Sequence, residues 1–134
     1  MRTLVVSLAC ATAALIWAGP AAAQTLTLTR SAQSGVESTI AQERGWDRNC
    51  NTVAVTVTIT KNPSNGTVSV ASGVTSTIPA STPASGSTGA CAGKSVTGNA
   101  VKYKSNAGFR GTDSVSYTVS NQPQRPRVIT INVQ

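Results

Sequence analysis

The feature that most restricts the fold of this chain is a period-two alternation of apolar and polar residues. In residues 53–60, valines and one isoleucine alternate with threonines and an alanine. This pattern places every second side chain on the same face of a β-strand, so one face packs on a core and the other meets water. β-Branched residues dominate the pattern, which favours strands over helices. The alternating runs are 25–29, 53–60, 68–70, 101–104, 114–120 and 129–134.

About six or seven runs of this kind, separated by turn residues, predict an all-β fold, an antiparallel β-sandwich of about seven strands. Residues 59–70 are expected to form its clearest hairpin, because Asn65-Gly66 can adopt positive φ in a tight turn. Two regions depart from the alternation. Residues 33–51 are irregular, with one helical turn predicted at 37–43. Residues 79–99 are rich in Pro, Ser, Thr and Gly and predict a long loop.

The N-terminal segment has the pattern of a secretory signal peptide. Arg2 precedes an apolar run at 4–18, and three alanines at 21–23 provide a small-residue cleavage site. A membrane anchor is the alternative, but the run is short for a span of about 20 residues. We therefore expect cleavage of 1–23, a single domain at 24–134 without a membrane span, and a secreted or periplasmic location. Cys10 lies inside the apolar run, where lipidation is not expected.

Cys50 and Cys91 are the cysteines of the expected mature chain. A pair of cysteines in an exported protein predicts a disulfide, with two buried free thiols as the alternative. The bridge would tie together the irregular regions 33–51 and 79–99, outside the best strands. The chain has no His, and two cysteines do not complete a zinc site, so we expect neither a metal nor a cofactor.

Several segments resemble bacterial Ig-like domains of the cadherin-like tandem type. They are Pro63-Ser64-Asn65-Gly66-Thr67-Val68, Val101-Lys102-Tyr103, Gly108-Phe109-Arg110-Gly111-Thr112-Asp113-Ser114-Val115-Ser116-Tyr117-Thr118-Val119, and the last strand at 128–133. The family usually has Pro where Ser105 stands here, is usually acidic, and lacks cysteines. The resemblance implies an Ig-like sandwich and a non-enzymatic role, as a protein-interaction or structural module of the cell envelope or surface.

The titratable residues offer little for catalysis. The absence of His excludes a Ser-His-Asp triad. Glu37, Glu43 and Asp47 could serve as an acid and a base for glycoside hydrolysis, but ion pairing with the nearby Arg44 and Arg48 is the simpler expectation.

Asp113 has two interpretations, a calcium ligand or a turn aspartate that accepts backbone N–H groups. Calcium needs about six to eight oxygen ligands, and the other three acids lie far away at 37–47, so the turn role is favoured.

Trp46 lies between two arginines in Arg44-Gly45-Trp46-Asp47-Arg48. Two alternatives stay open for its ring: packing against the disulfide, or exposure as part of a surface that binds a protein or a glycan.

The basic residues predict a second class of function. Removal of 1–23 leaves ten basic residues against four acids, a net charge of +6. Lys102 and Lys104 share a strand face and could form a cationic patch with Arg110, Arg125 and Arg127. Such a patch would bind an anionic polymer or glycan, or it would serve only solubility and general attraction to an anionic envelope. Nucleic acid is not an expected partner of an exported protein. The candidate interaction surface is Arg44, Trp46, Arg48, Lys102 and Lys104.

Overall fold

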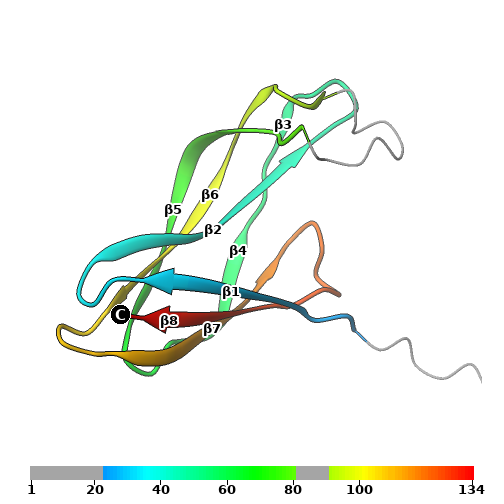
Figure 1. Ribbon diagram of the computed structural model, residues 1–134. Coiled ribbons are helices and arrows are strands. Elements are labelled where there is room, and N and C mark those ends of the chain that lie inside the picture. The colour runs from blue at the N-terminus through cyan, green and yellow to red at the C-terminus, as the bar shows by residue number, and fades with distance from the viewer. Residues whose placement is uncertain (1–22, 81–90) are drawn as a thin grey trace, which may run out of the picture.

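The computed structural model describes residues 23–80 and 91–134, which form two packed four-stranded sheets (Figure 1). The strands are β1 (Leu26–Ala32), β2 (Glu37–Trp46), β3 (Thr52–Val53), β4 (Val57–Lys61), β5 (Gly66–Thr77), β6 (Ser95–Ser105), β7 (Gly111–Val119) and β8 (Arg127–Val133). One sheet has the order β1-β8-β7-β4 and the other the order β3-β2-β6-β5. The prediction of an all-β sandwich with one disulfide is confirmed.

The strand order is that of an immunoglobulin fold, with β4, β7 and β8 facing β2, β6 and β5. One pair differs from the antiparallel expectation, since β1 and β8 run parallel. These strands lie at opposite ends of the described chain. The turn after β1 leads directly into the other sheet, so no hairpin imposes an antiparallel direction on them.

The main core lies between the sheets and follows the alternation seen in the sequence. Its largest members are Tyr103 and Tyr117, which are fully buried. The other buried members are Ala32, Ile40, Ala41, Val55, Val101, Val115, Val119, Ile129, Ile131 and Val133. Each fully buried Val or Ile contributes roughly 1.5–3 kcal/mol, so this core is the principal source of stability.

A second, smaller core stabilises one end of the β3-β2-β6-β5 sheet. Ile78, Cys91 and Val96 are buried there, and Trp46 and Cys50 pack against them. Alternation along β6 puts Val96 on the face opposite to Val101 and Tyr103, so this cluster covers the outer face of the sheet. We call this end the arm, made of 45–53, 74–80 and 91–98. It projects away from β1 and β8 (Figure 1).

The predicted hairpin at 59–70 is wrong. β4 pairs with β7 and β5 pairs with β6, so residues 62–65 carry the chain from one sheet to the other. Gly66 does not have positive φ. A Cβ at Gly66 would fall 2.8 Å from Cε2 of Tyr103, so glycine is needed there for close packing on the core.

The irregular regions are more regular than predicted. The helical turn at 37–43 is wrong, because these residues belong to β2. A bulge between Thr39 and Ala41 leaves Ile40 and Ala41 both buried, which breaks the period-two pattern. The loop predicted at 79–99 ends early, since β6 begins at Ser95. Residues 81–90 of that loop lie outside the described residues.

Asp113 is the turn aspartate that the sequence favours. Its carboxylate accepts the N–H groups of Ser64, Asn65 and Ser114, each at 2.9 Å, and the hydroxyl of Tyr103 at 3.0 Å. Burial alone would raise its pKa, but these four hydrogen bonds outweigh burial and lower it. Burial and the bond to Asp113 raise the pKa of Tyr103 to about 12. Asp113 thus holds the crossing at 62–65 against the core.

Asp113→Asn is expected to lower the free energy of unfolding at pH 7 by about 1–3 kcal/mol, because an amide nitrogen cannot accept these hydrogen bonds. A carboxylate with a lowered pKa in the folded state stabilises the fold above its unfolded pKa of about 3.9, and this contribution disappears as pH falls through the folded value. Between pH 7 and pH 3, the free energy of unfolding measured in urea should therefore fall less for the variant than for the wild type. Glu37→Gln is the control. If the free energy of unfolding falls equally in wild type and Asp113→Asn, the Asp113 carboxylate does not stabilise the fold in this way.

Candidate interaction surface

Strand register places three predicted surface residues on one outer face of the β3-β2-β6-β5 sheet. Tyr103 points into the core, so its neighbours Lys102 and Lys104 point outward. Glu37 pairs across from Lys104, and its carboxylate forms an ion pair of 3.0 Å with Nζ of Lys102. Arg44 pairs across from Gly98, which shares the outward face of β6 with both lysines.

Arg44 crosses the sheet over Gly98. Its Nη1 donates to Oγ of Ser76 on β5 at 2.7 Å, spanning the whole width of β6. A Cβ at Gly98 would fall 2.9 Å from Cβ of Arg44, so the glycine leaves the space in which the arginine lies. The guanidinium is therefore held in place on the sheet.

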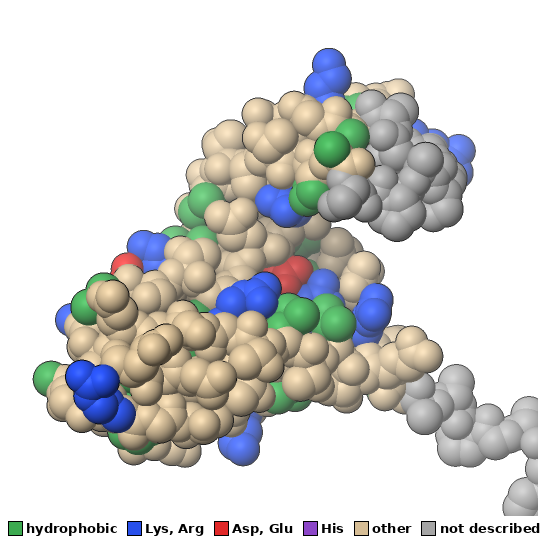
Figure 2. Space-filling model, in the orientation of Figure 1, with side chains coloured by type: hydrophobic (Ala, Val, Ile, Leu, Met, Phe, Trp, Pro, Cys, Tyr) green, Lys and Arg blue, Asp and Glu red, His purple; other side chains and the backbone are tan. Residues whose placement is uncertain are grey.

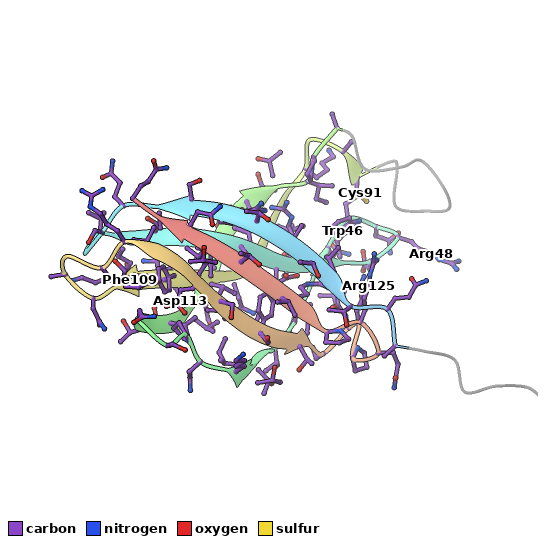
Figure 3. The ribbon with its side chains drawn as sticks, turned by 60° about the horizontal axis from the view of Figure 1, so that its bottom comes forward. Trp46, Arg48, Cys91, Phe109, Asp113 and Arg125 are labelled. Atoms are coloured by element: carbon purple, nitrogen blue, oxygen red, sulfur yellow. A yellow bond between two sulfur atoms is a disulfide. The ribbon has the colours of Figure 1, made fainter. Side chains whose placement is uncertain are left out.

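Trp46 and Arg48 occupy the arm (Figure 3). Trp46 is half-buried and packs against the cluster that contains Cys91, which is the first of the two alternatives for its ring. The Cys50–Cys91 disulfide joins the turn after β2 to the segment before β6. Figure 3 shows Phe109 and Asp113 at the opposite end of the molecule.

Asp47 shapes the turn that presents Arg48. Its Oδ1 accepts the N–H groups of Asn49 at 2.8 Å and Asn51 at 2.9 Å, and its Oδ2 accepts the side-chain amide of Asn51 at 3.1 Å. The bonds from Asn51 are the main reason that the pKa of Asp47 is lowered. Cys50 completes the turn with a φ of 65°. Arg48 is left exposed at the tip.

The predicted ion pairs within 37–48 are wrong. Glu37 pairs with Lys102, Glu43 pairs with Arg127, and Asp47 binds asparagines. The pleat separates the charges, because Glu43 faces the opposite sheet whereas Arg44 faces outward.

Glu43 and Arg127 form a buried link between the two sheets. Arg127 Nε and Nη2 donate to the two carboxylate oxygens of Glu43 at 2.7 and 3.1 Å, and the Tyr117 hydroxyl donates to Oε1 at 2.8 Å. Burial and the bond to Glu43 raise the pKa of Tyr117, and the bond to Glu43 raises the pKa of Arg127. All three groups have structural roles here.

The predicted patch of five cations does not form. Arg127 is 8% exposed and belongs to the core. Arg110 precedes β7 and Arg125 follows it, so a full strand length separates them. Of the five cations in the predicted patch, Lys102 and Lys104 are the pair that lies on one strand face.

Most of the basic side chains in the described residues are nonetheless not paired with a carboxylate. Within 23–80 and 91–134, eight of ten Lys and Arg side chains have no carboxylate within 4.0 Å, since the two ion pairs involve Lys102 and Arg127. Figure 2 shows several of these cations on both sides of the hollow that separates the arm from the rest of the sandwich.

Sequence reasoning missed Arg30, which bridges β1 and β2. Arg30 Nε donates to the Ile40 carbonyl of β2 at 3.0 Å, and its Nη1 donates to the Thr29 carbonyl of β1 at 2.9 Å. A signal was present, because Arg30 interrupts the apolar positions of the alternating strand Leu26, Leu28 and Ala32. An inward-pointing charge on an edge strand protects that edge from pairing.

No protein-family model matches the chain, and no curated protein shows significant sequence similarity to it. The described part of the chain contains no helix long and apolar enough to span a membrane.

Proposed function

We propose that the chain is an exported, non-enzymatic Ig-like domain that acts as a protein-interaction or structural module of the cell envelope or surface. The arm carries this proposal. A disulfide and a separate apolar cluster hold it, although it adds nothing to the core between the sheets. We take the surface that this separate structure presents, with Arg48 exposed at its tip, to be the interaction surface.

Export is supported by the N-terminal pattern at 1–23, which lies largely outside the described residues, and by the disulfide, which fits an oxidising compartment. The resemblance to bacterial Ig-like domains is supported by the strand order and by the position of Asp113, which the shared motif contains. Function depends on sites and not on the fold, so the arm has the greater weight.

A non-enzymatic role is supported by the uses of the carboxylates. Glu43 and Asp113 are buried and saturated with donors, Asp47 shapes a turn, and Glu37 lies in an exposed ion pair. A general acid or base must be free to exchange a proton with a substrate. Glu43 and Asp113 lack that freedom, because every one of their observed partners is a hydrogen-bond donor inside the fold.

Affinity capture from envelope extract tests the proposal. Immobilised wild-type protein should retain a specific partner that Arg48→Glu loses, because this substitution reverses the charge at the tip of the arm. Lys61→Glu is the matched control, since Lys61 is exposed on β4 in the other sheet. Equal retention by all three proteins, or retention of nothing specific, would refute a role for the arm.

A second candidate, a polyanion-binding secreted protein, is favoured by the eight cations that have no carboxylate partner. It predicts binding to heparin or lipopolysaccharide that weakens steeply with salt. Lys104→Glu and Lys61→Glu should then weaken binding by similar factors, because the charge is spread over several faces. Salt-insensitive binding would exclude this candidate.

A further inference from the structure

Two strand edges face each other along one side of the sandwich. β1 pairs with β8 on one side only, and β2 has β6 on one side while β3 reaches only Gly45 and Trp46. In the described chain, the outer edge of β2 at 37–44 therefore has no paired strand. β1 and β2 meet at the turn 33–36 and diverge toward the arm (Figure 1). We call this side of the molecule the seam.

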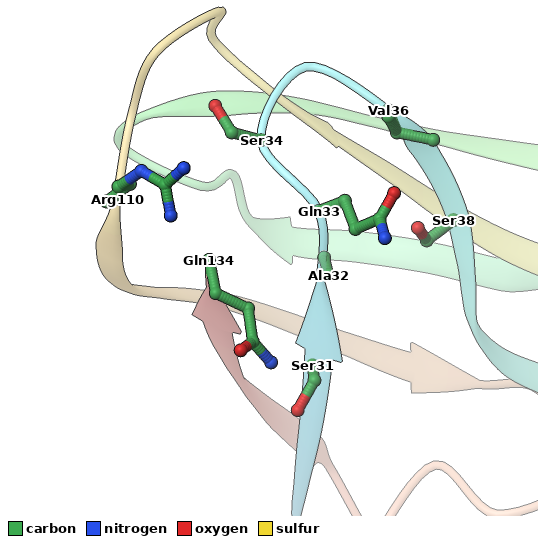
Figure 4. Close-up of a pocket in the computed structure, with 8 residues that line it drawn as sticks. All are labelled: Ser31, Ala32, Gln33, Ser34, Val36, Ser38, Arg110 and Gln134. Atoms are coloured by element: carbon green, nitrogen blue, oxygen red, sulfur yellow. The ribbon is translucent and has the colours of Figure 1, made fainter.

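Two shallow hollows lie along the seam. Near the turn, β1 and β2 line a hollow of about 730 Å³ together with Arg110 and Gln134 (Figure 4). Further along, Arg30 and residues 39–42 and Arg44 line a second hollow of about 460 Å³. The lining side chains of the first are mainly hydroxyls and amides. The bridge from Arg30 to the Ile40 carbonyl lies at the second hollow.

The charge of the second hollow is positive. Arg30 and Arg44 line it, and none of its described lining residues is acidic. The neighbouring Glu43 is bound to Arg127 and Tyr117 and does not neutralise it. Arg30 is exposed and hydrogen-bonds backbone carbonyls only, so it can exchange those contacts for a carboxylate, which makes a stronger charge-assisted bond.

We propose, building on the interaction role above, that the seam receives an extended acidic segment of a partner protein as an added strand along β2. Backbone groups of β2 at 37–44 would supply the hydrogen bonds of strand addition. Arg30 would select a carboxylate of the segment, whereas Arg44 stays bound to Ser76 across β6 and adds positive charge nearby.

A second copy of this chain is a poor occupant for the seam. Each mature chain carries a net charge of +6, so two copies repel. The other strands with an unpaired edge, β3, β4 and β5, contain no Asp or Glu. They could pair with β2 but could not supply a carboxylate to Arg30.

Three synthetic peptides of about eight residues, a common strand length, test the proposal. One alternates Glu with Val, the second alternates Lys with Val, and the third is the Glu peptide with N-methyl groups on alternate amides. We expect only the first to bind, by fluorescence anisotropy, and to slow amide exchange in β2 at 37–44 without slowing it in β4 or β5. The N-methyl peptide keeps the charge but cannot pair as a strand.

Arg30→Glu should weaken binding of the Glu peptide by about tenfold or more, and Lys61→Glu by less than about threefold. Thermal unfolding checks that both variants are folded. Arg30→Gln should weaken binding of the Glu peptide by an intermediate factor. Equal binding of the N-methyl or Lys peptide, protection outside β2, or indifference to Arg30→Glu would overturn the proposal. So would the absence of any binding. Capture of an envelope partner that depends on the arm but not on Arg30 would then leave the interaction role standing and refute the seam alone.

Discussion

Replacing Cys50 and Cys91 with alanine is expected to lower the free energy of unfolding by about 4 kcal/mol. The bridge closes a loop of 41 residues, and the loop-entropy relation gives roughly this value for such a length. The protein should nevertheless remain folded at room temperature, because the main core contains neither cysteine. Urea unfolding of the double variant measures the loss.

The local effect should be confined to the arm. Trp46 packs against the cluster that the bridge holds, so its fluorescence should shift to the red while the far-ultraviolet circular dichroism of the sheets persists. Val96→Ala is a matched control, since it loosens the same cluster but keeps the cross-link. If the sheets melt on removal of the bridge, the disulfide belongs to the core and the arm is not a separate unit.

The sandwich could be predicted from the sequence because strands β7 and β8 keep an uninterrupted alternation. Val115, Tyr117 and Val119 face the core as their spacing requires. β2 could not be recognised in this way. Its bulge at Ile40 places two consecutive residues in the core, and a pattern of period two does not survive an inserted residue.

Pairing partners were less predictable than strands. The sequence Asn65-Gly66 is typical of a hairpin turn, but local turn preference says nothing about which sheet the next strand joins. Here Asp113, 48 residues further along the chain, binds the Asn65 N–H and directs the crossing between the sheets. Such a contact is non-local, so no window of sequence around the turn contains it.

The candidate surface was predictable where it depended on alternation alone. Lys102 and Lys104 share a face because they are two positions apart on one strand, with Tyr103 between them. The relation of Arg44 to Ser76 and of Glu43 to Arg127 depends on register between strands far apart in sequence. The sequence marks Arg30 as unusual, because a charge stands at an apolar position of the alternation. Its contact with β2 could not be predicted, because it depends on how the edges of two different sheets come together.

Arg127→Met should be among the most damaging single substitutions, with an expected loss of about 3–5 kcal/mol, because it leaves the carboxylate of Glu43 buried without its cation. The side chains of Arg127 and Glu43 are only 9% and 11% exposed. Lys102→Met is the control, because it breaks an ion pair whose side chains are 36% and 52% exposed. An exposed pair contributes about 0–1 kcal/mol. Urea unfolding of both variants compares the two pairs directly.

The double variant Glu43→Leu/Arg127→Met decides what the buried link does. Removing both charges leaves no unpaired ion, so this variant should be more stable than Arg127→Met alone. The Tyr117 hydroxyl would lose its acceptor, and Tyr117→Phe in the same background should recover part of the remaining loss. Because the three groups come from β2, β7 and β8, they join the two sheets at one point between them. If Arg127→Met costs no more than Lys102→Met, water reaches the pair and apolar packing alone holds the sheets together there.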